Sequence, residues 1–366
     1  EPLEPDIREH FPGRMDKPQI IIHAEKNYNH TVFDVCWVPC SAKFIVASSL
    51  PRGTGLLEVM EITQGDVQSV RQVHKDLSFK CATFGSSSLY NRSLATGDFG
   101  GNLNIWDMEN FSQPIYKAQA HNGILNAIDG IGGQVGHGAP EIATCGLDGK
   151  VKVWDARQKD RPVAVMETRD ETKRDCWTVS FGNSYNDEER VLAAGYDNGD
   201  LKIFDLRKMS ILWETNLKNG VCSVQFDRKD TMMNKLVVTT LEGRIYIFDM
   251  SVQHHKSGYN YLCERSQKST VWLCRHLPQN RDVFITSGGD GSLYLWKYNY
   301  PGQRHQEDRE GYKTSVMGSL SSLQHVTVSS QPITGYDWNS DKTGLGVCSS
   351  LDQTVRVLLV TRLASC

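Results

Sequence analysis

The feature that most constrains this chain is a short stretch of sequence that recurs, with variations, along most of its length. The clearest copy, residues 146–155, reads Gly-Leu-Asp-Gly-Lys-Val-Lys-Val-Trp-Asp. Asp148-Gly149 is a tight-turn dipeptide, because glycine tolerates the positive φ that a two-residue hairpin demands. The valines and lysines that follow alternate as in a strand with one apolar face and one solvated face, and Trp154 closes that strand. The stretch therefore predicts a hairpin turn followed by a β-strand.

The same pattern returns in four close copies and two weaker ones. The close copies are residues 100–107, 198–205, 242–249 and 290–297, and the weaker ones are residues 54–61 and 352–359. Successive copies lie about 45–50 residues apart except before the last, and a repeat of this length that ends in Trp-Asp is typical of a four-stranded propeller blade. We therefore predict an all-β fold, a single seven-bladed β-propeller that spans residues 17–366.

Two further strands are expected upstream of each copy. The first ends in an aromatic residue or a substitute for one, and the second is small and apolar, which suits blades that press face to face. The first strands, expected to be the innermost of their blades, are residues 33–37, 80–84, 126–130, 177–181, 222–226, 272–276 and 334–338.

The last copy ends close to the end of the chain, which leaves its blade one strand short. A three-stranded blade would expose an unpaired edge. Residues 18–23, Pro-Gln-Ile-Ile-Ile-His, form an apolar strand with no blade of its own. We therefore expect the N-terminal strand to join the last blade and close the ring, so that deletion of residues 17–24 unfolds or aggregates the protein. Residues 1–16 are expected to be a disordered extension or a tag, and no role is assigned to them.

The longer final interval contains an insertion at about residues 298–320. This segment is polar, mixed in charge and without periodicity, so we predict a mobile loop between the third and fourth strands of the sixth blade. Two roles remain open for it: a tolerated surface insertion, which we favour, or a partner-binding arm.

Composition excludes several classes of function. A net charge of −3 and a pI of about 6.4 give no electrostatic footprint for nucleic acid or an anionic membrane. No apolar run reaches the roughly 18 residues of a membrane span, so we expect a soluble protein. Most of the ten cysteines fall in predicted apolar strands, as expected for buried thiols in a reducing compartment, and Cys36 and Cys40 lack the further ligands of a metal site. These observations favour the cytoplasm.

One constellation of polar residues could be mistaken for a catalytic triad. His121, Thr144, Asp148 and Trp154 resemble the hydrogen-bonded tetrad of WD-repeat proteins, in which the histidine joins a turn aspartate to a strand hydroxyl and the tryptophan indole. No nucleophile elbow or oxyanion loop accompanies them. We therefore predict a structural tetrad. The sequence offers no catalytic residue, cofactor site or metal site, and no enzymatic activity is expected.

The surface that remains for function is the mouth of the central channel. In a propeller, the residue four before the end of each innermost strand tends to lie at this mouth. Here these residues are Phe33, Lys80, Asn126, Trp177, Cys222, Trp272 and Thr334, with Arg174 on a charged connection beside Trp177. Aromatic side chains around a concave mouth are typical of a protein-binding hot spot. Alternatively, these rings pack beneath their own loops.

Sequence segments outside the repeat pattern indicate a narrower family for this chain. It is identified as a member of the WD-repeat family, and from Lys17 to Val360 it resembles the Monad family of WD-repeat factors for cytoplasmic preassembly of axonemal dynein. The phrases that carry this resemblance are residues 37–44, 94–103, 126–133, 173–179, 194–200, 275–281 and 352–357.

The resemblance implies a non-catalytic adaptor, which we expect to be monomeric. Its implied partners are the co-chaperone complex of RuvB-like ATPases and prefoldin-like subunits, together with dynein heavy chains, in cells that build motile cilia. An association with apoptosis is also attached to the family. The resemblance assigns no partner-binding residue, so the channel mouth is inferred from the propeller geometry alone.

A second class of function stays open. Trp154-Asp-Ala-Arg157 and Phe204-Asp-Leu-Arg207 fit the WD-x-R motif of substrate receptors that dock on the DNA-damage-binding adaptor of cullin-RING ubiquitin ligases. In the alternative interpretation, which we favour, Arg157 and Arg207 cap their blades and pair with a neighbouring aspartate.

Overall fold

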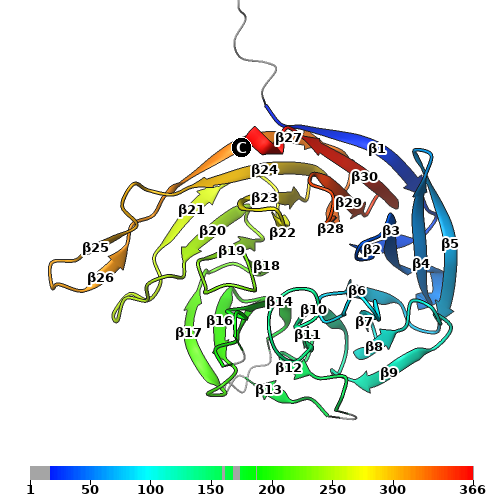
Figure 1. Ribbon diagram of the computed structural model, residues 1–366, viewed down its shortest axis with the longest axis horizontal. Helices are drawn as coiled ribbons and strands as arrows, with labels where there is room; N and C mark the ends of the chain where they lie inside the picture. The colour runs from blue at the N-terminus through cyan, green and yellow to red at the C-terminus, as the bar shows by residue number, and fades with distance from the viewer. Residues whose placement is uncertain (1–16, 159–160, 168–173, 187, 366) are drawn as a thin grey trace, which may run out of the picture.

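The computed structural model describes residues 17–158, 161–167, 174–186 and 188–365. Seven four-stranded antiparallel sheets surround a central axis, so the predicted seven-bladed β-propeller is confirmed (Figure 1). The predicted disordered extension, residues 1–16, lies outside the described residues.

The first four blades follow the chain without interruption. Blade one consists of β2 (Thr31–Trp37), β3 (Lys43–Ser49), β4 (Gly55–Thr63) and β5 (Asp66–Lys75), with a 3₁₀ turn at Pro51–Gly53. Blade two consists of β6 (Phe79–Thr83), β7 (Leu94–Asp98), β8 (Asn102–Trp106) and β9 (Pro114–Gln119). Blade three consists of β10 (Leu125–Ile131), β11 (Glu141–Gly146), β12 (Val151–Trp154) and β13 (Ala164–Met166). Blade four consists of β14 (Cys176–Gly182), β15 (Val191–Tyr196), β16 (Asp200–Asp205) and β17 (Ser210–Asn216).

The last three blades include the insertion and the closure of the ring. Blade five consists of β18 (Val221–Phe226), β19 (Lys235–Thr240), β20 (Arg244–Asp249) and β21 (Tyr261–Arg265). Blade six consists of β22 (Val271–Leu277), β23 (Asn280–Gly288), β24 (Ser292–Asn299) and β27 (Ser319–Thr327). Blade seven combines β28 (Ile333–Trp338), β29 (Leu345–Ser350) and β30 (Thr354–Thr361) with β1 (Gln19–Asn27), and a 3₁₀ turn at Leu363–Ser365 follows.

The turn chemistry predicted from the repeat is present at each clear copy. Gly149 adopts a φ of 74°, and a Cβ added there would lie 2.4 Å from the carbonyl oxygen of Arg174. Both the backbone conformation and the close approach of the next blade therefore require glycine at this turn.

The core is divided among the interfaces between blades. In one cluster Leu201 of blade four packs with Val221 and Val238 of blade five, and in another Leu295 of blade six packs with Tyr336 and Leu358 of blade seven. Neighbouring blades thus bury one another's apolar faces, as closed propellers require.

The N-terminal strand closes the ring, as predicted. β1 pairs antiparallel with β30, from Gln19 opposite Thr361 to Asn27 opposite Thr354. The strand is longer than the predicted residues 18–23, because it continues past a register shift between Ile22 and Ala24. The two ends of the chain therefore share one sheet (Figure 1).

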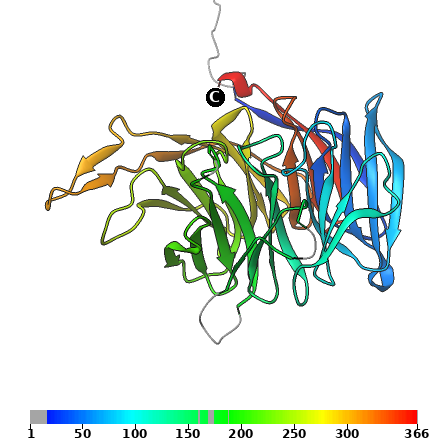
Figure 2. The same cartoon turned by 60° about the horizontal axis from the view of Figure 1, so that its bottom comes forward.

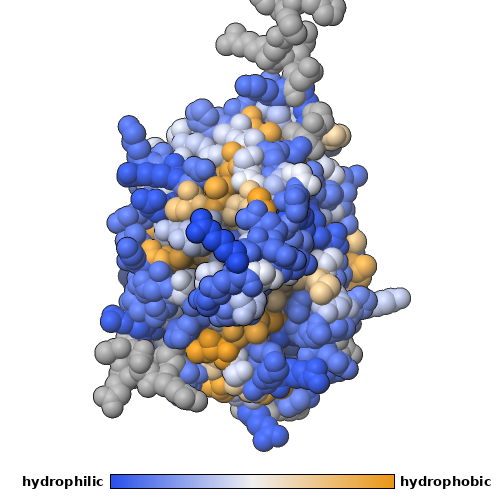
Figure 3. Space-filling view, turned by 90° about the vertical axis from the view of Figure 1, so that its left-hand side faces the viewer, coloured by the Kyte–Doolittle hydropathy of each residue, from blue (hydrophilic) through white to orange (hydrophobic). Residues whose placement is uncertain are grey.

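The prediction of a mobile loop at residues 298–320 is wrong. The insertion does lie between the third and fourth strands of blade six, but it folds as a hairpin of β25 (His305–Glu307) and β26 (Lys313–Ser315). Figures 1 and 2 show it projecting from the ring beside the long connection between β20 and β21. Figure 3 views the molecule from this side, where hydrophilic side chains cover most of the surface and hydrophobic areas lie between them.

Polar contacts with the connection of blade five explain why the hairpin is ordered. Asp308 of the hairpin pairs with His254 at 3.0 Å, and the two rings of His255 and Tyr312 lie 3.9 Å apart. The Asn260 amide donates to the Thr314 hydroxyl at 2.9 Å. Because these partners are polar and distant in the sequence, the segment shows no hydrophobic periodicity that could have revealed the hairpin.

Candidate protein-interaction site at the channel mouth

The innermost strands of the seven blades enclose a central channel with a volume of about 770 Å³. The seven side chains predicted at its mouth all line this channel: Phe33, Lys80, Asn126, Trp177, Cys222, Trp272 and Thr334. Arg174, the eighth residue proposed for the surface, is exposed on the connection before β14 and is not part of the lining.

A cation and two aromatic rings meet on the side of blades one and two. The rings of Phe33 and Phe99 lie 5.2 Å apart, and the Lys80 ammonium lies 4.7 Å from the centre of the Phe33 ring. Burial lowers the pKa of Lys80, although the charge of Asp34 acts in the opposite direction. Phe99 is not one of the residues predicted at the mouth, so its contact with the Phe33 ring is a new finding.

Two tryptophans provide the largest apolar surfaces of the ring. Trp272 is 36% exposed, and Trp177 is half-buried. A Cβ placed on Gly220 would lie 2.8 Å from the Trp177 ring, 2.9 Å from Leu241 and 2.8 Å from the carbonyl oxygen of Asp197. The Trp177 ring of blade four and Leu241 of blade five are therefore both held against the backbone at Gly220, which permits contact with a partner at small entropic cost.

Exposed leucines from the turns between second and third strands extend the apolar surface. Leu147, Leu241 and Leu351 are 42%, 37% and 38% exposed. They occupy the same position of their turns, just before the turn's acidic residue, and these turns lie at the ends where β10, β18 and β28 begin. The sequence analysis did not include them, although the repeat register would have identified them.

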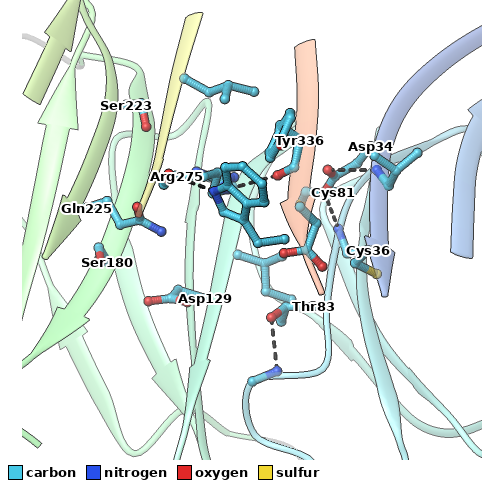
Figure 4. A pocket seen from close by; sticks show the side chains of 18 of the residues that line it. Asp34, Cys36, Cys81, Thr83, Asp129, Ser180, Ser223, Gln225, Arg275 and Tyr336 are labelled. Atoms are coloured by element: carbon cyan, nitrogen blue, oxygen red, sulfur yellow. Dashed lines mark hydrogen bonds between the residues drawn. The ribbon is translucent and has the colours of Figure 1, made fainter. Parts of the chain in front are cut away.

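Deeper in the channel, side chains bind the backbone of the neighbouring blade (Figure 4). The Asp34 carboxylate accepts the backbone N–H of Ala82 at 2.9 Å, and Asp129 accepts that of Phe181 at 2.8 Å. The Thr178 hydroxyl likewise accepts the Val224 N–H at 3.1 Å. These groups are thus engaged within the protein and stabilise the ring.

Arg275 joins blades six and seven in the same way. Its Nε donates to the Tyr336 carbonyl at 3.2 Å, and the Trp338 indole donates back to the Arg275 carbonyl at 3.1 Å (Figure 4). This reciprocal pair, like the other cross-links, fixes the wall of the channel beneath the mouth.

The four residues of the predicted tetrad form a continuous chain of hydrogen bonds. His121 Nδ1 lies 2.8 Å from Asp148 Oδ1, His121 Nε2 lies 2.8 Å from Thr144 Oγ1, and the Trp154 indole donates to the same hydroxyl at 2.9 Å. Burial raises the pKa of Asp148, but the hydrogen bonds from His121 and the Asn122 amide outweigh it and bring the pKa to about 2. The chain links β11 and β12 to the connection before blade three.

Other blades keep only part of this arrangement. In blades two and six the Trp106 and Trp296 indoles donate to Thr96 and Thr286, each at 2.9 Å.

The two arginines of the WD-x-R motifs lie apart. Arg157 forms a forked ion pair with Asp155 of its own motif, with a shortest contact of 2.7 Å. Arg207 lies 3.7 Å from Glu188 and lines a depression of about 620 Å³ to which Arg157 does not contribute. Both side chains are 64% exposed.

In the part of the chain that the structure describes, no group of three or more His, Cys, Asp or Glu side chains could hold a metal ion. The same residues include no helix long and apolar enough to cross a bilayer.

Comparison of the sequence with known proteins identifies the family of this chain. A family model described as Nucleolar protein 10-like, N-terminal domain, matches residues 110–262. The chain is 60% identical over 351 residues to dynein axonemal assembly factor 10 of Xenopus laevis, and 59% identical over 350 residues to the Homo sapiens protein of that name. The Chlamydomonas reinhardtii protein of the same name is 53% identical over 351 residues. Each alignment covers 95% of this chain and 98% of the relative. The resemblance to Monad-type WD-repeat proteins is thereby confirmed, and the chain belongs to the dynein axonemal assembly factor 10 family.

Proposed function

We propose that this protein is a non-catalytic scaffold in the assembly of axonemal dyneins and that its channel mouth contacts protein partners. The role in dynein assembly is supported by relatives from vertebrates and a green alga that carry this function in their name and align over 95% of this chain. The observation that carries the site is the ring of Phe33, Trp177 and Trp272 around one concave opening.

The exposed apolar side chains around the mouth favour it as a binding surface. Trp272 and Leu351, which line the channel, leave more than a third of their surface in water, as do Leu147 and Leu241 on neighbouring turns. Burial of such side chains by a partner contributes about 25 cal/mol per Å² before the costs of association. Aromatic anchors on a rigid frame are the residues that typically dominate such interfaces.

The partners follow from the resemblance rather than from the geometry. They are the co-chaperone complex of RuvB-like ATPases and prefoldin-like subunits, and the dynein heavy chains that this complex helps to assemble. The protein acts in the cytoplasm of cells that build motile cilia, as a monomer that brings chaperone and client together.

The test is affinity purification of the tagged full-length chain from ciliating cells. The test variant is Trp177→Ala/Trp272→Ala, and Tyr90→Ala is the control, because Tyr90 is an aromatic side chain that is 99% exposed and lies outside the channel lining. Recovery of RuvB-like ATPases and dynein heavy chains with the wild type and the control, but a loss of at least about fivefold with the test variant, supports both function and site. Full recovery with a folded test variant rejects the site, and absence of dynein and chaperone from every sample rejects the function.

A substrate receptor of a cullin-RING ubiquitin ligase is the alternative function. The exposure of Arg157 and Arg207 leaves both guanidinium groups accessible to an adaptor. The forked pair between Arg157 and Asp155 favours the capping role, because docking through Arg157 would have to replace that pair.

A further inference from the structure

Charged side chains of opposite sign lie on two sides of the channel mouth. Lys80 lines the mouth from blade two, whereas Asp175 and Asp197 lie beside Trp177 at the edge of blade four. Among the described residues, none of these three side chains forms an ion pair. At two other turns on this face, Asp148 pairs with His121 and Asp352 pairs with Arg356.

Among the residues that the structure describes, no cationic side chain pairs with Asp175 or Asp197. The Asp197 backbone N–H donates to the Asp175 carbonyl at 3.0 Å, which holds the two residues together. Burial, and then the charge of Asp197, raise the pKa of Asp175. One carboxylate oxygen of Asp197, Oδ1, is buried and has no hydrogen-bond partner. Because the two side chains are only half-buried, a cationic donor from a partner could reach the carboxylate oxygens that remain accessible.

In the described part of the chain, no acidic side chain forms an ion pair with Lys80. The nearest acidic group that acts on Lys80 is Asp34, whose carboxylate is already occupied by the backbone N–H groups of Val35 and Ala82. The Lys80 ammonium rests over the Phe33 ring, a contact that leaves its other N–H donors free to bind a carboxylate.

The surface between the two charged sides is apolar. The Trp177 ring and Leu241 each lie against Gly220, and Trp272 lines the same channel from blade six. A partner that crosses the mouth from Lys80 to Asp197 therefore passes over aromatic rings.

We propose that the channel mouth binds an extended protein segment that carries an acidic, a bulky apolar and a basic side chain in close succession. The acidic group pairs with Lys80, the apolar group packs between Trp177 and Trp272, and the basic group pairs with Asp175 and Asp197. This proposal rests on the proposed function, since it specifies the partner of the same site.

Other segments fit less well. A purely acidic segment brings like charge to Asp175 and Asp197, and a purely basic one brings it to Lys80. A neutral apolar segment covers the unpaired charges without compensating them, which costs free energy on desolvation. The arrangement of charges thus selects both the composition and the direction of the bound segment.

The direct test uses two synthetic peptides and the full-length protein. The probe is acetyl-Glu-Gly-Phe-Leu-Gly-Lys-amide, and its matched control replaces Glu and Lys with Gln. Binding is followed through the indole N–H signals of Trp177 and Trp272 in NMR spectra, which are assigned with the Trp177→Phe and Trp272→Phe variants. We expect the charged peptide to shift both signals with at least about threefold higher affinity, and added salt to reduce this advantage.

Two variants test the two charged sides of the mouth separately. The purification experiment described above distinguishes a failure of this inference from a failure of the proposed function. Lys80→Met and Asp197→Asn are close in size to the native residues, and each should remove part of the preference for the charged peptide while thermal unfolding shows an intact fold. Equal affinity for the two peptides, or an undiminished preference in both variants, overturns the inference. If Trp177→Ala/Trp272→Ala still loses dynein heavy chains, the proposed site survives this failure; if neither peptide shifts the indole signals and that variant retains dynein, both proposals fail.

Discussion

The carboxylate of Asp337 on β28 accepts the backbone N–H of Trp37 on β2 at 2.8 Å, although 300 residues separate them. The Trp37 indole in turn donates to the Asp337 carbonyl at 3.2 Å. This reciprocal contact joins the last blade to the first at the inner wall, while β1 joins the last blade at the outer edge. The seam that closes the ring is therefore held on both sides.

The buried state of Asp337 makes this seam sensitive to pH. Burial raises the pKa of its carboxyl to about 7, against the Trp37 amide and Arg275, which lower it, and Asp34 adds to the increase. The folded protein thus binds a proton that the unfolded chain releases near pH 4. The stability that protonated Asp337 contributes is fully present below pH 4 and is lost as pH rises to about 7. Over this range the free energy of unfolding falls by up to about 1.4 kcal/mol per pH unit.

Asp337→Asn should remove this dependence. The amide oxygen can still accept the Trp37 N–H, but the side chain no longer ionises. We expect the free energy of unfolding in urea to fall less between pH 4 and 7 in the variant than in the wild type. An equally steep fall in the variant would assign the effect to other groups.

The outer side of the seam can be tested on two adjacent isoleucines of β1. Ile20 packs into the core between blades six and seven, whereas Ile21 is 44% exposed. Ile20→Asp should lower the free energy of unfolding by about 2–4 kcal/mol, because it removes a core contact and introduces a charge. Ile21→Asp, the control, should cost less than about 1 kcal/mol. Thermal or urea unfolding measures both, and equal losses would show that β1 contributes only backbone pairing.

The repeat explains what could be predicted and what could not. The number of blades, the innermost strands and the channel-lining side chains follow from one register repeated seven times, so an error at one copy is corrected by the others. Contacts that do not recur from blade to blade could not be predicted in this way. The hairpin β25–β26 depends on pairs such as His254 with Asp308, and the aromatic contact of Phe99 with Phe33 joins two blades. Neither has a periodic signal in the sequence.

The placement of Arg174 shows the same limit. Its position two residues before β14 suggested a side chain at the mouth, but the residue lies on an exposed connection whose backbone carbonyl instead contacts the Gly149 turn. Side-chain direction in a connection depends on its local backbone, which the strand register does not determine.

The ubiquitin-ligase alternative makes an opposite prediction from the scaffold proposal. Arg157→Glu/Arg207→Glu should leave recovery of dynein heavy chains unchanged, because both side chains lie outside the channel lining. The fold should also be retained, since both guanidinium groups are 64% exposed. Purification of the tagged variant beside the wild type checks this. Recovery of a cullin adaptor with the wild type, and its loss with the variant, would instead support the receptor function.

The tetrad of blade three allows a comparison with its partial copy in blade two. Thr144 and Thr96 are both fully buried. Among the described residues, the Thr144 hydroxyl bonds to His121 and the Trp154 indole, whereas the Thr96 hydroxyl bonds to the Trp106 indole alone. Thr144→Val therefore leaves two buried polar groups without a partner and Thr96→Val leaves one. Because each such group costs about 1–3 kcal/mol, the first substitution should lower the free energy of unfolding by about 1–3 kcal/mol more than the second.

Urea unfolding of the two valine variants measures this difference, and the pH dependence provides an independent check. The pKa of Asp148, about 2, depends on its hydrogen bonds from His121 and the Asn122 amide. The contribution of ionised Asp148 to the free energy of unfolding is fully present above about pH 4 and is lost as pH falls towards 2. In Thr144→Val, His121 is no longer held through Nε2, so we expect a smaller loss of stability between pH 4 and 2. Equal effects of the two substitutions would mean that His121 keeps its position through Asp148 alone.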